Sequence, residues 1–310
     1  MPTIVIKMGD ESPAEYIAEM HMLDPTLTIR EWPDVGNPAH VDIAMVWKMP
    51  HGELAKFPNL KLTMSMAAGV DHVLSDPDMP RQVPLVRVTD PHMARSMGHW
   101  AAMNILRLHR ETDFYEDLRS RREWAPERAF NTDAVQVGIL GLGYLGTHVG
   151  GMLQGMGLKV QGWARSPKSI DGIKSFQGPD GLREMVETTN YLLCLLPSTP
   201  ATVGIINAEL LARMPKGSYV LNCGRGAQLV EQDLTAALDL GQIAGAALDV
   251  FSVEPLPQDH PFWVDKRIIM TPHHAAEVFP PAVAATFLDN IQRCREGRPL
   301  NGLVDLDIGY

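Results

Sequence analysis

Residues 137–146 read Val-Gly-Ile-Leu-Gly-Leu-Gly-Tyr-Leu-Gly, a GxGxxG pattern that directly follows an apolar run and opens a helical stretch. In this pattern Gly141 permits a tight turn, Gly143 lets the backbone approach a pyrophosphate, and Gly146 lets helix and strand pack closely. The helix N-terminus then faces the anion. An ordinary glycine turn can share the bare pattern, but the strand before it and the helix after it favour a dinucleotide-binding turn.

Short apolar runs, many of them β-branched, alternate with helical stretches on both sides of this turn. Buried parallel strands have this appearance because helices cover both faces of their sheet. The alternation therefore predicts an α/β fold with two doubly wound parallel sheets. The expected strands are Thr3 to Ile6, Ile43 to Trp47, Leu62 to Met66 and Leu85 to Val88 in a first series, and Gln136 to Leu140, Lys159 to Trp163, Tyr191 to Leu195, Tyr219 to Asn222, Gly245 to Asp249 and Ile268 to Thr271 in a second.

A long helical segment separates the two series. It runs from Ser96 to about Leu118, and its apolar side is expected to carry Trp100, Met103, Leu106 and Leu108. We predict one continuous helix here, which bridges two domains.

The C-terminal stretch is too short to form a domain of its own. Residues Ala282 to Glu296 have a helical pattern that stops at Gly297, a residue typical of a helix C-cap. We expect this helix to pack on the first series and to make that domain discontinuous. The predicted domains are residues 1–97 with 279–310, and residues 98–278.

Charge and cysteine content narrow the class of protein. The 310 residues carry a formal net charge of -10, so the basic surface of a nucleic-acid-binding protein is missing. Cys194, Cys223 and Cys294 contain no CxxC pair, and the histidines lack metal-ligand spacing, so neither a disulfide framework nor a metal site is predicted.

No secretory signal opens the sequence, and no apolar run is long enough to cross a bilayer. We therefore expect a cytoplasmic protein without nucleic-acid or membrane partners.

The segment after the second strand of the nucleotide-binding half indicates which dinucleotide is bound. It reads Trp-Ala-Arg-Ser-Pro-Lys over residues 163–168, without the carboxylate that binds the ribose 2′-hydroxyl of NAD. A guanidinium pairs with a 2′-phosphate, and a serine hydroxyl adds a donor. We predict that Arg165, Ser166 and Lys168 favour NADP(H) over NAD(H). The alternative is that Arg165 and Lys168 are solvated surface charges.

Three polar residues follow three strands of the same half: Arg225, Glu254 and His273. The carboxyl ends of parallel strands are where an open α/β sheet places its ligand. A histidine paired with a carboxylate suits a proton donor to a developing alkoxide, because the ion pair favours the imidazolium. An arginine fork matches a substrate carboxylate. Taken alone, the arginine could be a surface charge at a helix start, the glutamate a loop carboxylate, and the histidine a hydrogen-bonded core residue. The three together predict hydride transfer to a carbonyl compound.

Further motifs extend along nearly the whole chain. They are Ala-Ala-Gly-Val-Asp-His at 67–72, Leu-Leu-Pro-Ser-Thr-Pro at 195–200, Asn-Cys-Gly-Arg-Gly at 222–226, Leu-Asp-Val-Phe at 248–251, Glu-Pro-Leu-Pro at 254–257, Thr-Pro-His at 271–273 and the terminal Gly-Tyr. With the glycine turn, these motifs resemble the D-isomer-specific 2-hydroxyacid dehydrogenase family, most closely its glyoxylate/hydroxypyruvate reductase A branch. The resemblance implies a flavodoxin-like substrate domain, a Rossmann dinucleotide-binding domain, and a cleft between them.

The resemblance also implies roles for single residues. Arg225 would bind substrate, His273 would be the acid/base, and Glu254 would orient and charge that histidine. The cofactor-binding residues it implies, together with those of the glycine turn and its 2′-phosphate segment, are Gly141, Gly143, Tyr144, Leu145, Gly146, Arg165, Ser166, Lys168, Leu196, Pro197, Ser198, Cys223 and Asp249. The substrate-binding residues are Trp47, Ala68, Gly69, Arg225 and His273. Trp47 is equally well interpreted as a tryptophan that packs a strand end.

Two departures from the family pattern bear on the substrate. His-Met-Ala-Arg-Ser at 92–96 stands where related sequences tend to carry an acidic residue, and Glu-Val-Phe at 277–279 stands where the branch often has an arginine. The expected substrate is therefore a 2-oxo acid that is either similar to glyoxylate and hydroxypyruvate or bulkier and more apolar than they are.

The same features bear on other possible functions and on the oligomeric state. Corepressors of the wider family resemble these enzymes, so a non-catalytic dinucleotide sensor is the alternative. The complete Arg-Glu-His set and the absence of a low-complexity tail favour the enzyme. A formate-type or phosphite-type dehydrogenase would need a preference for NAD and other pocket residues. Relatives resemble homodimers, and we expect a homodimer with the segment from Ser96 through Trp124 and beyond as its interface. The alternative is that the apolar face of this segment only covers its own domain.

Overall fold

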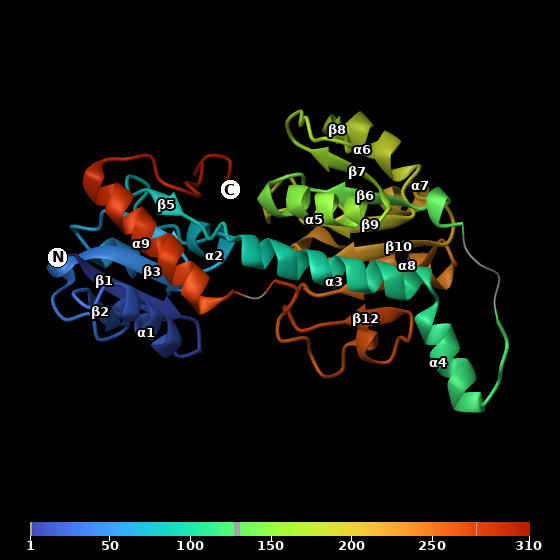
Figure 1. The fold of residues 1–310 in the computed structure, drawn as a ribbon, viewed down its shortest axis with the longest axis horizontal. Helices are drawn as coiled ribbons and strands as arrows, with labels where there is room; N and C mark the ends of the chain where they lie inside the picture. The colour runs from blue at the N-terminus through green and yellow to red at the C-terminus, as the bar shows by residue number, and fades with distance from the viewer. Residues whose placement is uncertain (1, 127–130, 277) are drawn as a thin grey trace. The chain divides into compact units, whose positions relative to one another are not determined.

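The computed structural model describes residues 2–126, 131–276 and 278–310. The chain divides into two compact units, Met1–Met93 with Val278–Tyr310, and Ala94–Glu277. These boundaries lie within a few residues of the expected divisions at 97/98 and 278/279. Each unit is a parallel sheet with helices packed on it (Figure 1).

The first unit contains a five-stranded sheet in the order β2-β1-β3-β4-β5, in which every neighbouring pair is parallel. This is the strand order of flavodoxin-like folds. The strands are β1 (Thr3–Met8), β2 (Thr28–Glu31), β3 (Val41–Trp47), β4 (Leu62–Ser65) and β5 (Leu85–Val86). The helices are α1 (Ala14–Leu23), α2 (Asp71–Leu74) and α9 (Pro280–Glu296), with short 3-10 turns η1 (Pro38–His40) and η2 (Leu54–Lys56).

The C-terminal helix belongs to the first unit, as predicted. In α9 the buried side chains include Val283, Phe287 and Ile291, which recur at a helical period and form one apolar stripe. The helix packs against α1 and β4 (Figure 1). It ends at Gly297, which adopts a left-handed conformation with φ 65°, so the predicted C-cap is confirmed.

The second unit contains a seven-stranded parallel sheet in the order β12-β11-β10-β9-β6-β7-β8. Its strands are β6 (Gln136–Leu140), β7 (Lys159–Ala164), β8 (Lys174–Gln177), β9 (Tyr191–Cys194), β10 (Ser218–Asn222), β11 (Ile243–Leu248) and β12 (Ile268–Met270). Its helices are α4 (Thr112–Arg121), α5 (Tyr144–Gly155), α6 (Gly178–Val186), α7 (Ala208–Arg213) and α8 (Glu231–Asp239), with η3 (Thr132–Ala134), η4 (Gly226–Gln228) and η5 (Pro261–Trp263), and α3 (Pro91–His109) leads into it.

Two apolar clusters cover the two faces of this sheet. One contains buried side chains of α6, α7 and α8, such as Met185, Leu210 and Leu234. The other contains side chains of α3 and α5, such as Ile105 and Val149. Helices therefore cover both faces, and the sheet is doubly wound as predicted.

Two strands escaped the sequence analysis, and both are edge strands. In β2 the residues are exposed or half-buried, and in β8 only Phe176 is buried. An edge strand has a neighbour on one side only, so it needs no continuous apolar run. The pattern of apolar runs is therefore weakest at these two positions.

The prediction of one helix from Ser96 to Leu118 was wrong. The helix breaks between α3 and α4, where Glu111 adopts a left-handed conformation with φ 48°. No glycine or proline marks this break in the sequence. The predicted apolar side was also partly wrong, because Met103 is 54% exposed, whereas Ala101 and Ile105 are buried.

Candidate functional site

Six loops that carry predicted site residues lie at one edge of the seven-stranded sheet. In the sheet order, they follow β12, β11, β10, β9, β6 and β7, and all these strands run in the same direction. The strand order reverses between β6 and β9, since α5 follows β6 on one face and α7 follows β9 on the other. Ligands of open α/β sheets bind in the crevice at such a reversal.

The glycine turn after β6 has the geometry that its pattern predicts. Gly141 has φ +104°, a conformation that favours glycine, and a Cβ on Gly146 would lie 1.8 Å from the Gly141 carbonyl oxygen. At Gly143, in contrast, a Cβ would meet no atom within 4 Å. Gly143 caps α5, whose first turn is formed by Tyr144 and Leu145. Space is therefore open at the one glycine where backbone must approach a ligand, and the turn fits a pyrophosphate at the helix N-terminus.

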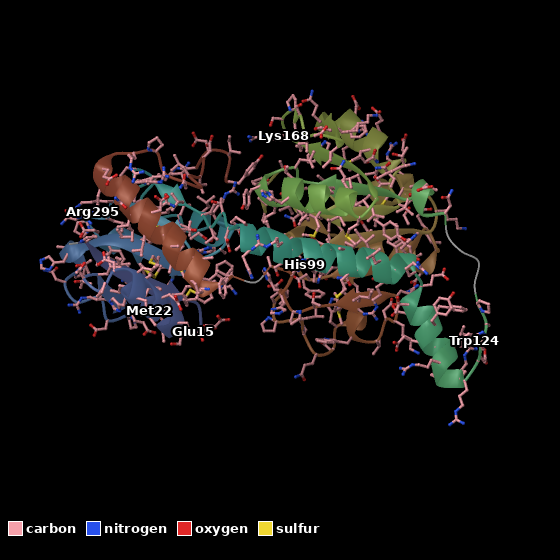
Figure 2. All side chains as sticks on the ribbon, in the orientation of Figure 1. Glu15, Met22, His99, Trp124, Lys168 and Arg295 are labelled. Atoms are coloured by element: carbon pink, nitrogen blue, oxygen red, sulfur yellow. The ribbon has the colours of Figure 1, made fainter. Side chains whose placement is uncertain are left out.

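The segment expected to select the dinucleotide follows β7. Arg165, Ser166 and Lys168 are all exposed, and Lys168 projects from the surface of the second unit (Figure 2). Their side chains are therefore accessible to a 2′-phosphate, and no acidic residue stands among them.

Two buried amides that the sequence analysis missed hold the loop after β10, and one of them, Gln228, also joins it to the loop after β9. Asn222 donates from Nδ2 to the Arg225 carbonyl oxygen at 2.9 Å, and its Oδ1 accepts from the Gly224 N–H at 3.2 Å. Gln228 accepts from the Arg225 N–H and donates to the Leu196 carbonyl oxygen at 3.1 Å. Both side chains are fully buried, so they fix the backbone of Arg225. The sequence does contain one indication of the role of Asn222, because it is a polar residue at the end of an otherwise apolar strand.

The residues predicted to line the cofactor site after these strands are only partly accessible. Leu196 and Cys223 are buried, and Pro197 and Ser198 are half-buried. Their side chains therefore pack mainly within the loops and present little surface to a ligand.

Gly226 brings the Arg225 loop against the loop that carries Glu254. A Cβ on Gly226 would lie 1.9 Å from the Phe251 carbonyl carbon, so only glycine allows this backbone contact. The Phe251 N–H in turn donates to Glu254 Oε1 at 3.0 Å. The arginine loop and the glutamate loop are therefore in direct contact.

Glu254 and His273 form the predicted pair. Glu254 Oε2 lies 2.8 Å from His273 Nδ1, and the two side chains are 29% and 39% exposed. This contact leaves Nε2 of His273 as the outer nitrogen of the ring. His273 has φ 57°, an uncommon conformation for a residue with a Cβ, and strained residues of this kind occur at functional sites.

Asp249 holds the backbone around His273. Its carboxylate accepts from the His274 N–H at 2.8 Å, from the Ala275 N–H at 2.9 Å, and from the Thr271 hydroxyl. The Thr271 hydroxyl oxygen also accepts from Trp100 Nε1 at 2.8 Å. Asp249 is 1% exposed, so these contacts stabilise the uncommon conformation of His273. Its expected contact with the nicotinamide carboxamide stays a prediction.

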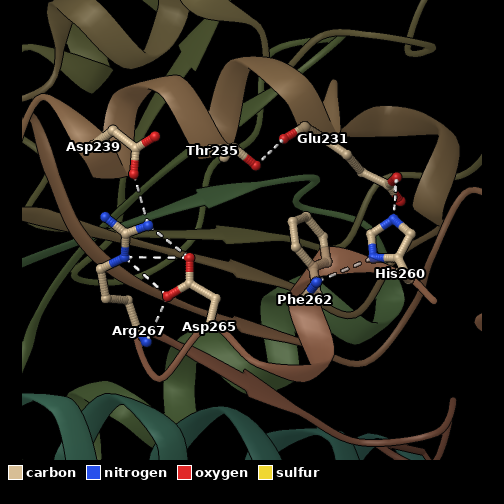
Figure 3. Close-up of polar contacts among 7 residues, drawn as sticks. All are labelled: Glu231, Thr235, Asp239, His260, Phe262, Asp265 and Arg267. Carbon is tan, nitrogen blue, oxygen red and sulfur yellow. Dashed lines mark hydrogen bonds and ion pairs between the residues drawn. The ribbon is translucent and has the colours of Figure 1, made fainter. Parts of the chain in front are cut away.

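Two polar clusters brace the loops between β11 and β12 (Figure 3). His260 Nε2 lies 3.3 Å from Glu231 Oε2, and Glu231 Oε1 accepts from the Ser252 N–H at 3.1 Å. This cluster ties the start of α8 to the loop that carries Glu254. Arg267 joins Asp265 to Asp239, at 2.6 and 2.8 Å, and ties the end of α8 to the start of β12.

Three predicted substrate residues lie in the first unit. Trp47 ends β3 and is half-buried. Ala68 and Gly69 belong to the loop that follows β4. The fully buried Ser65 accepts from the Ala67 N–H at 3.2 Å and donates to the Gly69 carbonyl oxygen at 2.9 Å, so its hydroxyl fixes the shape of this loop.

The positions that depart from the family pattern are also partly described. Arg95 is exposed, and the His92 ring stacks on Phe279 at a centroid distance of 5.1 Å. Glu277 lies outside the described residues. Phe279 is 47% exposed, so an aromatic face is present beside the position where the branch often has an arginine.

Burial makes two of the three thiols unreactive. It raises the pKa of Cys194 to about 12, and burial together with the charge of Asp249 raises the pKa of Cys223. Because the thiolate is the nucleophile, we expect iodoacetamide at pH 8 to label only Cys294 in the folded protein. Intact-mass spectrometry should find one adduct before unfolding and three after it. Labelling of Cys194 or Cys223 in the folded protein at the rate of Cys294 would contradict this.

In the part of the chain that the structure describes, no group of three or more histidine, cysteine or acidic side chains is arranged to hold a metal ion. Nor does any helix there combine the length and the apolar character needed to cross a bilayer.

Comparison with known proteins adds sequence and structural relatives. Residues 102–275 match the model of the D-isomer specific 2-hydroxyacid dehydrogenase NAD binding domain. Glyoxylate/hydroxypyruvate reductase A of Serratia proteamaculans (strain 568) is 40% identical over 301 residues, which cover 96% of this chain and 96% of the relative.

Two solved structures are similar over the full length. A D-isomer specific 2-hydroxyacid dehydrogenase from Xanthobacter autotrophicus Py2, in complex with NADPH and MES, matches with a TM-score of 0.95 and 35% identity, covering 100% of this chain and 99% of that one. An NADPH-dependent glyoxylate/hydroxypyruvate reductase from Sinorhizobium meliloti, in complex with NADP and sulfate, matches with a TM-score of 0.94 and 34% identity, covering 100% of both chains.

Proposed function

Because the chain belongs to the D-isomer specific 2-hydroxyacid dehydrogenase family, we propose that it reduces a 2-oxo acid to the D-2-hydroxy acid with NADPH. The observation that carries this proposal is the Glu254–His273 pair, with its 2.8 Å contact at the ligand-binding edge of the second sheet. The Sinorhizobium meliloti relative, named an NADPH-dependent glyoxylate/hydroxypyruvate reductase, supports the cofactor. The Serratia relative, named glyoxylate/hydroxypyruvate reductase A, supports the reaction class.

His273 is the proton donor in this proposal. Glu254 contacts Nδ1 and stabilises the imidazolium, so that Nε2 carries a proton toward the substrate oxygen. Asp249, through the backbone N–H groups of residues 274 and 275, keeps the ring in place. Proton transfer from His273 neutralises the alkoxide as it develops.

In the second unit, Arg225 is proposed as a partner of a substrate carboxylate, because an arginine fork matches that group. In the first unit, the backbone N–H groups of Ala68 and Gly69 are proposed as donors to a carboxylate. Asn222, Gln228 and Ser65 keep these loops in their shapes. A carboxylate held in this way orients the neighbouring carbonyl group for reaction.

The cofactor supplies a hydride when it is bound. The glycine turn fits its pyrophosphate, because Gly143 is open while Gly141 and Gly146 are packed. Arg165, Ser166 and Lys168 would hold the 2′-phosphate, and Leu196, Pro197, Ser198 and Cys223 would line the remaining wall.

The dinucleotide preference can be tested at Arg165. We expect Arg165→Ala to raise the KM for NADPH about 10–100-fold, the effect of losing a charge-assisted hydrogen bond, and to change the KM for NADH about twofold at most. Initial rates with each reduced nicotinamide measure both constants, and Arg183→Ala, which removes an exposed arginine on α6, is the matched control. Equal effects on the two cofactors would contradict the assignment.

The substrate is proposed to be bulkier or more apolar than glyoxylate. The exposed Phe279 and the absence of an arginine from residues 277–279 support this choice. Initial rates for a panel of 2-oxo acids with NADPH, followed by the loss of nicotinamide absorbance, test both the activity and the choice. No oxidation with any member would reject the reductase, and a clear preference for glyoxylate would reject the bulky substrate. Chiral chromatography of the product tests the D configuration.

The protein is proposed to act as a cytoplasmic homodimer. The outer side of α3 carries the exposed Met103 and Leu106, and Trp124 after α4 is 99% exposed (Figure 2). Apolar surface of this kind is typical of subunit interfaces. Light scattering should give twice the chain mass of 34.2 kDa, whereas a monomer mass at micromolar concentration would reject the dimer.

A further inference from the structure

A histidine of the first unit lies between the two segments proposed to contact the substrate. Trp47 and Lys48 stand at the end of β3, and the loop of residues 67–69 follows β4. The two strands are neighbours, with Val46 paired to Ser65. One more backbone bond follows, from the Met66 N–H to the Val46 carbonyl oxygen. His72, from the short helix α2, contacts Trp47 and Lys48 on one side and Ser65, at the end of β4, on the other.

The hydrogen bonds of His72 define the protonation of its ring. The Lys48 N–H donates to Nδ1 at 3.2 Å, so Nδ1 is an acceptor and carries no proton. Nε2 lies 3.0 Å from the Ser65 hydroxyl oxygen, and in the neutral ring it carries the proton and donates. The imidazole thus links a backbone donor at the end of β3 to a buried hydroxyl at the end of β4.

Ser65 continues this link to the loop. Its hydroxyl lies within donor distance of two carbonyl oxygens, Gly69 at 2.9 Å and Ala67 at 3.2 Å, and accepts from both the Ala67 N–H and His72. A serine hydroxyl has two acceptor sites, and the Ala67 N–H and His72 use both. Loss of His72 would therefore leave one of these sites without a donor, so His72 supports the loop through Ser65.

His72 also supports the tryptophan. The Trp47 and His72 rings meet edge to face with centroids 4.5 Å apart, a favourable aromatic geometry. Lys48, the donor to His72, has φ 52°, and a non-glycine residue in this conformation needs support from its surroundings. The imidazole supplies this support, so it positions the indole as well as the loop.

We propose that His72 is a positioning residue that sets the spacing between the carboxylate-binding loop 67–69 and the side-chain wall at Trp47. The inference rests on the proposed function, since it concerns the same substrate. A 2-oxo acid anchored through its carboxylate meets Trp47 at a distance that His72 controls. His72 thus determines which substrate side chains fit, without touching the substrate.

The test compares two substrates of different size in variants of His72. With His72→Ala we expect the KM for glyoxylate to rise about tenfold, and the ratio of kcat/KM for phenylpyruvate to that for glyoxylate to change by about threefold or more. The KM for NADPH should stay within about twofold of wild type, because the substitution is not expected to disturb the cofactor site or the overall fold. His72→Asn keeps an acceptor for Lys48 but is too short to reach Ser65, so its ratio should lie between those of wild type and His72→Ala.

A second histidine of the same unit is the matched control. His51 contacts the Ser75 hydroxyl at 3.4 Å on the exposed surface, and His51→Ala should leave the substrate ratio unchanged. If His72→Ala does not fold, His72→Asn decides alone. A ratio equal to wild type in every folded His72 variant overturns this inference while the reductase stands. Wild-type protein that reduces no 2-oxo acid overturns the proposed function and this inference together.

Discussion

The His273→Ala variant should turn over 2-oxo acid about 10²–10⁴-fold more slowly than wild type, the usual contribution of a positioned general acid. His273 is 39% exposed and its ring contacts Glu254, so its removal opens no cavity in the apolar core. The Kd for NADPH should change about twofold at most, because the glycine turn lies in another loop. Stopped-flow rates and a fluorescence titration with NADPH measure the two quantities separately.

Two further variants sharpen this result. Glu254→Gln keeps a hydrogen-bond partner for Nδ1 but removes the charge, so its kcat should fall between wild type and His273→Ala. His99→Ala removes an exposed histidine of α3 (Figure 2) and should retain full activity. Near-normal turnover by His273→Ala would remove the proposed proton donor, and loss of NADPH binding in the same variant would point to a structural role instead.

The fold was largely predictable because most strands of this protein are buried on both faces. Runs such as Ile139–Leu140 and Leu192–Leu193 are fully buried, so their sequence has to be apolar at successive positions. Edge strands carry no such constraint, which is why β2 and β8 were missed. The break at Glu111 was missed because this residue adopts a left-handed conformation although it is not a glycine. Such a conformation is uncommon for a residue with a Cβ, so the local sequence does not predict it.

The candidate site was predictable only for residues whose chemistry is distinctive. The sequence paired His273 with Glu254, and the two side chains are in contact at 2.8 Å. The residues that hold the loops, Asn222, Gln228 and Ser65, were not found, because the sequence does not show which backbone groups a buried amide or hydroxyl will meet. The partners of Asn222 and Ser65 lie two to four residues away but depend on the loop conformation, and Gln228 also donates to Leu196, 32 residues away. Such partners are known only after folding.

Gly143→Ala should raise the KM for NADPH about tenfold or more while the free energy of unfolding stays within about 0.5 kcal/mol of wild type. The backbone at Gly143 has φ -81° and ψ -160°, which alanine adopts without strain. A Cβ there meets no protein atom within 4 Å, so the folded protein accommodates it. The added methyl group instead occupies the space into which the pyrophosphate must approach the helix N-terminus.

Gly146→Ala, three residues along the same turn, is the contrasting variant. Its Cβ would lie 1.8 Å from the Gly141 carbonyl oxygen, so the turn or α5 must shift, and overpacking of this kind costs about 1–3 kcal/mol. We expect its unfolding transition to move to lower denaturant concentration and its NADPH binding to weaken, because the turn itself is displaced. Urea titration separates the two variants: a stable Gly143→Ala protein with wild-type affinity for NADPH would mean that the open space at this glycine does not receive the cofactor.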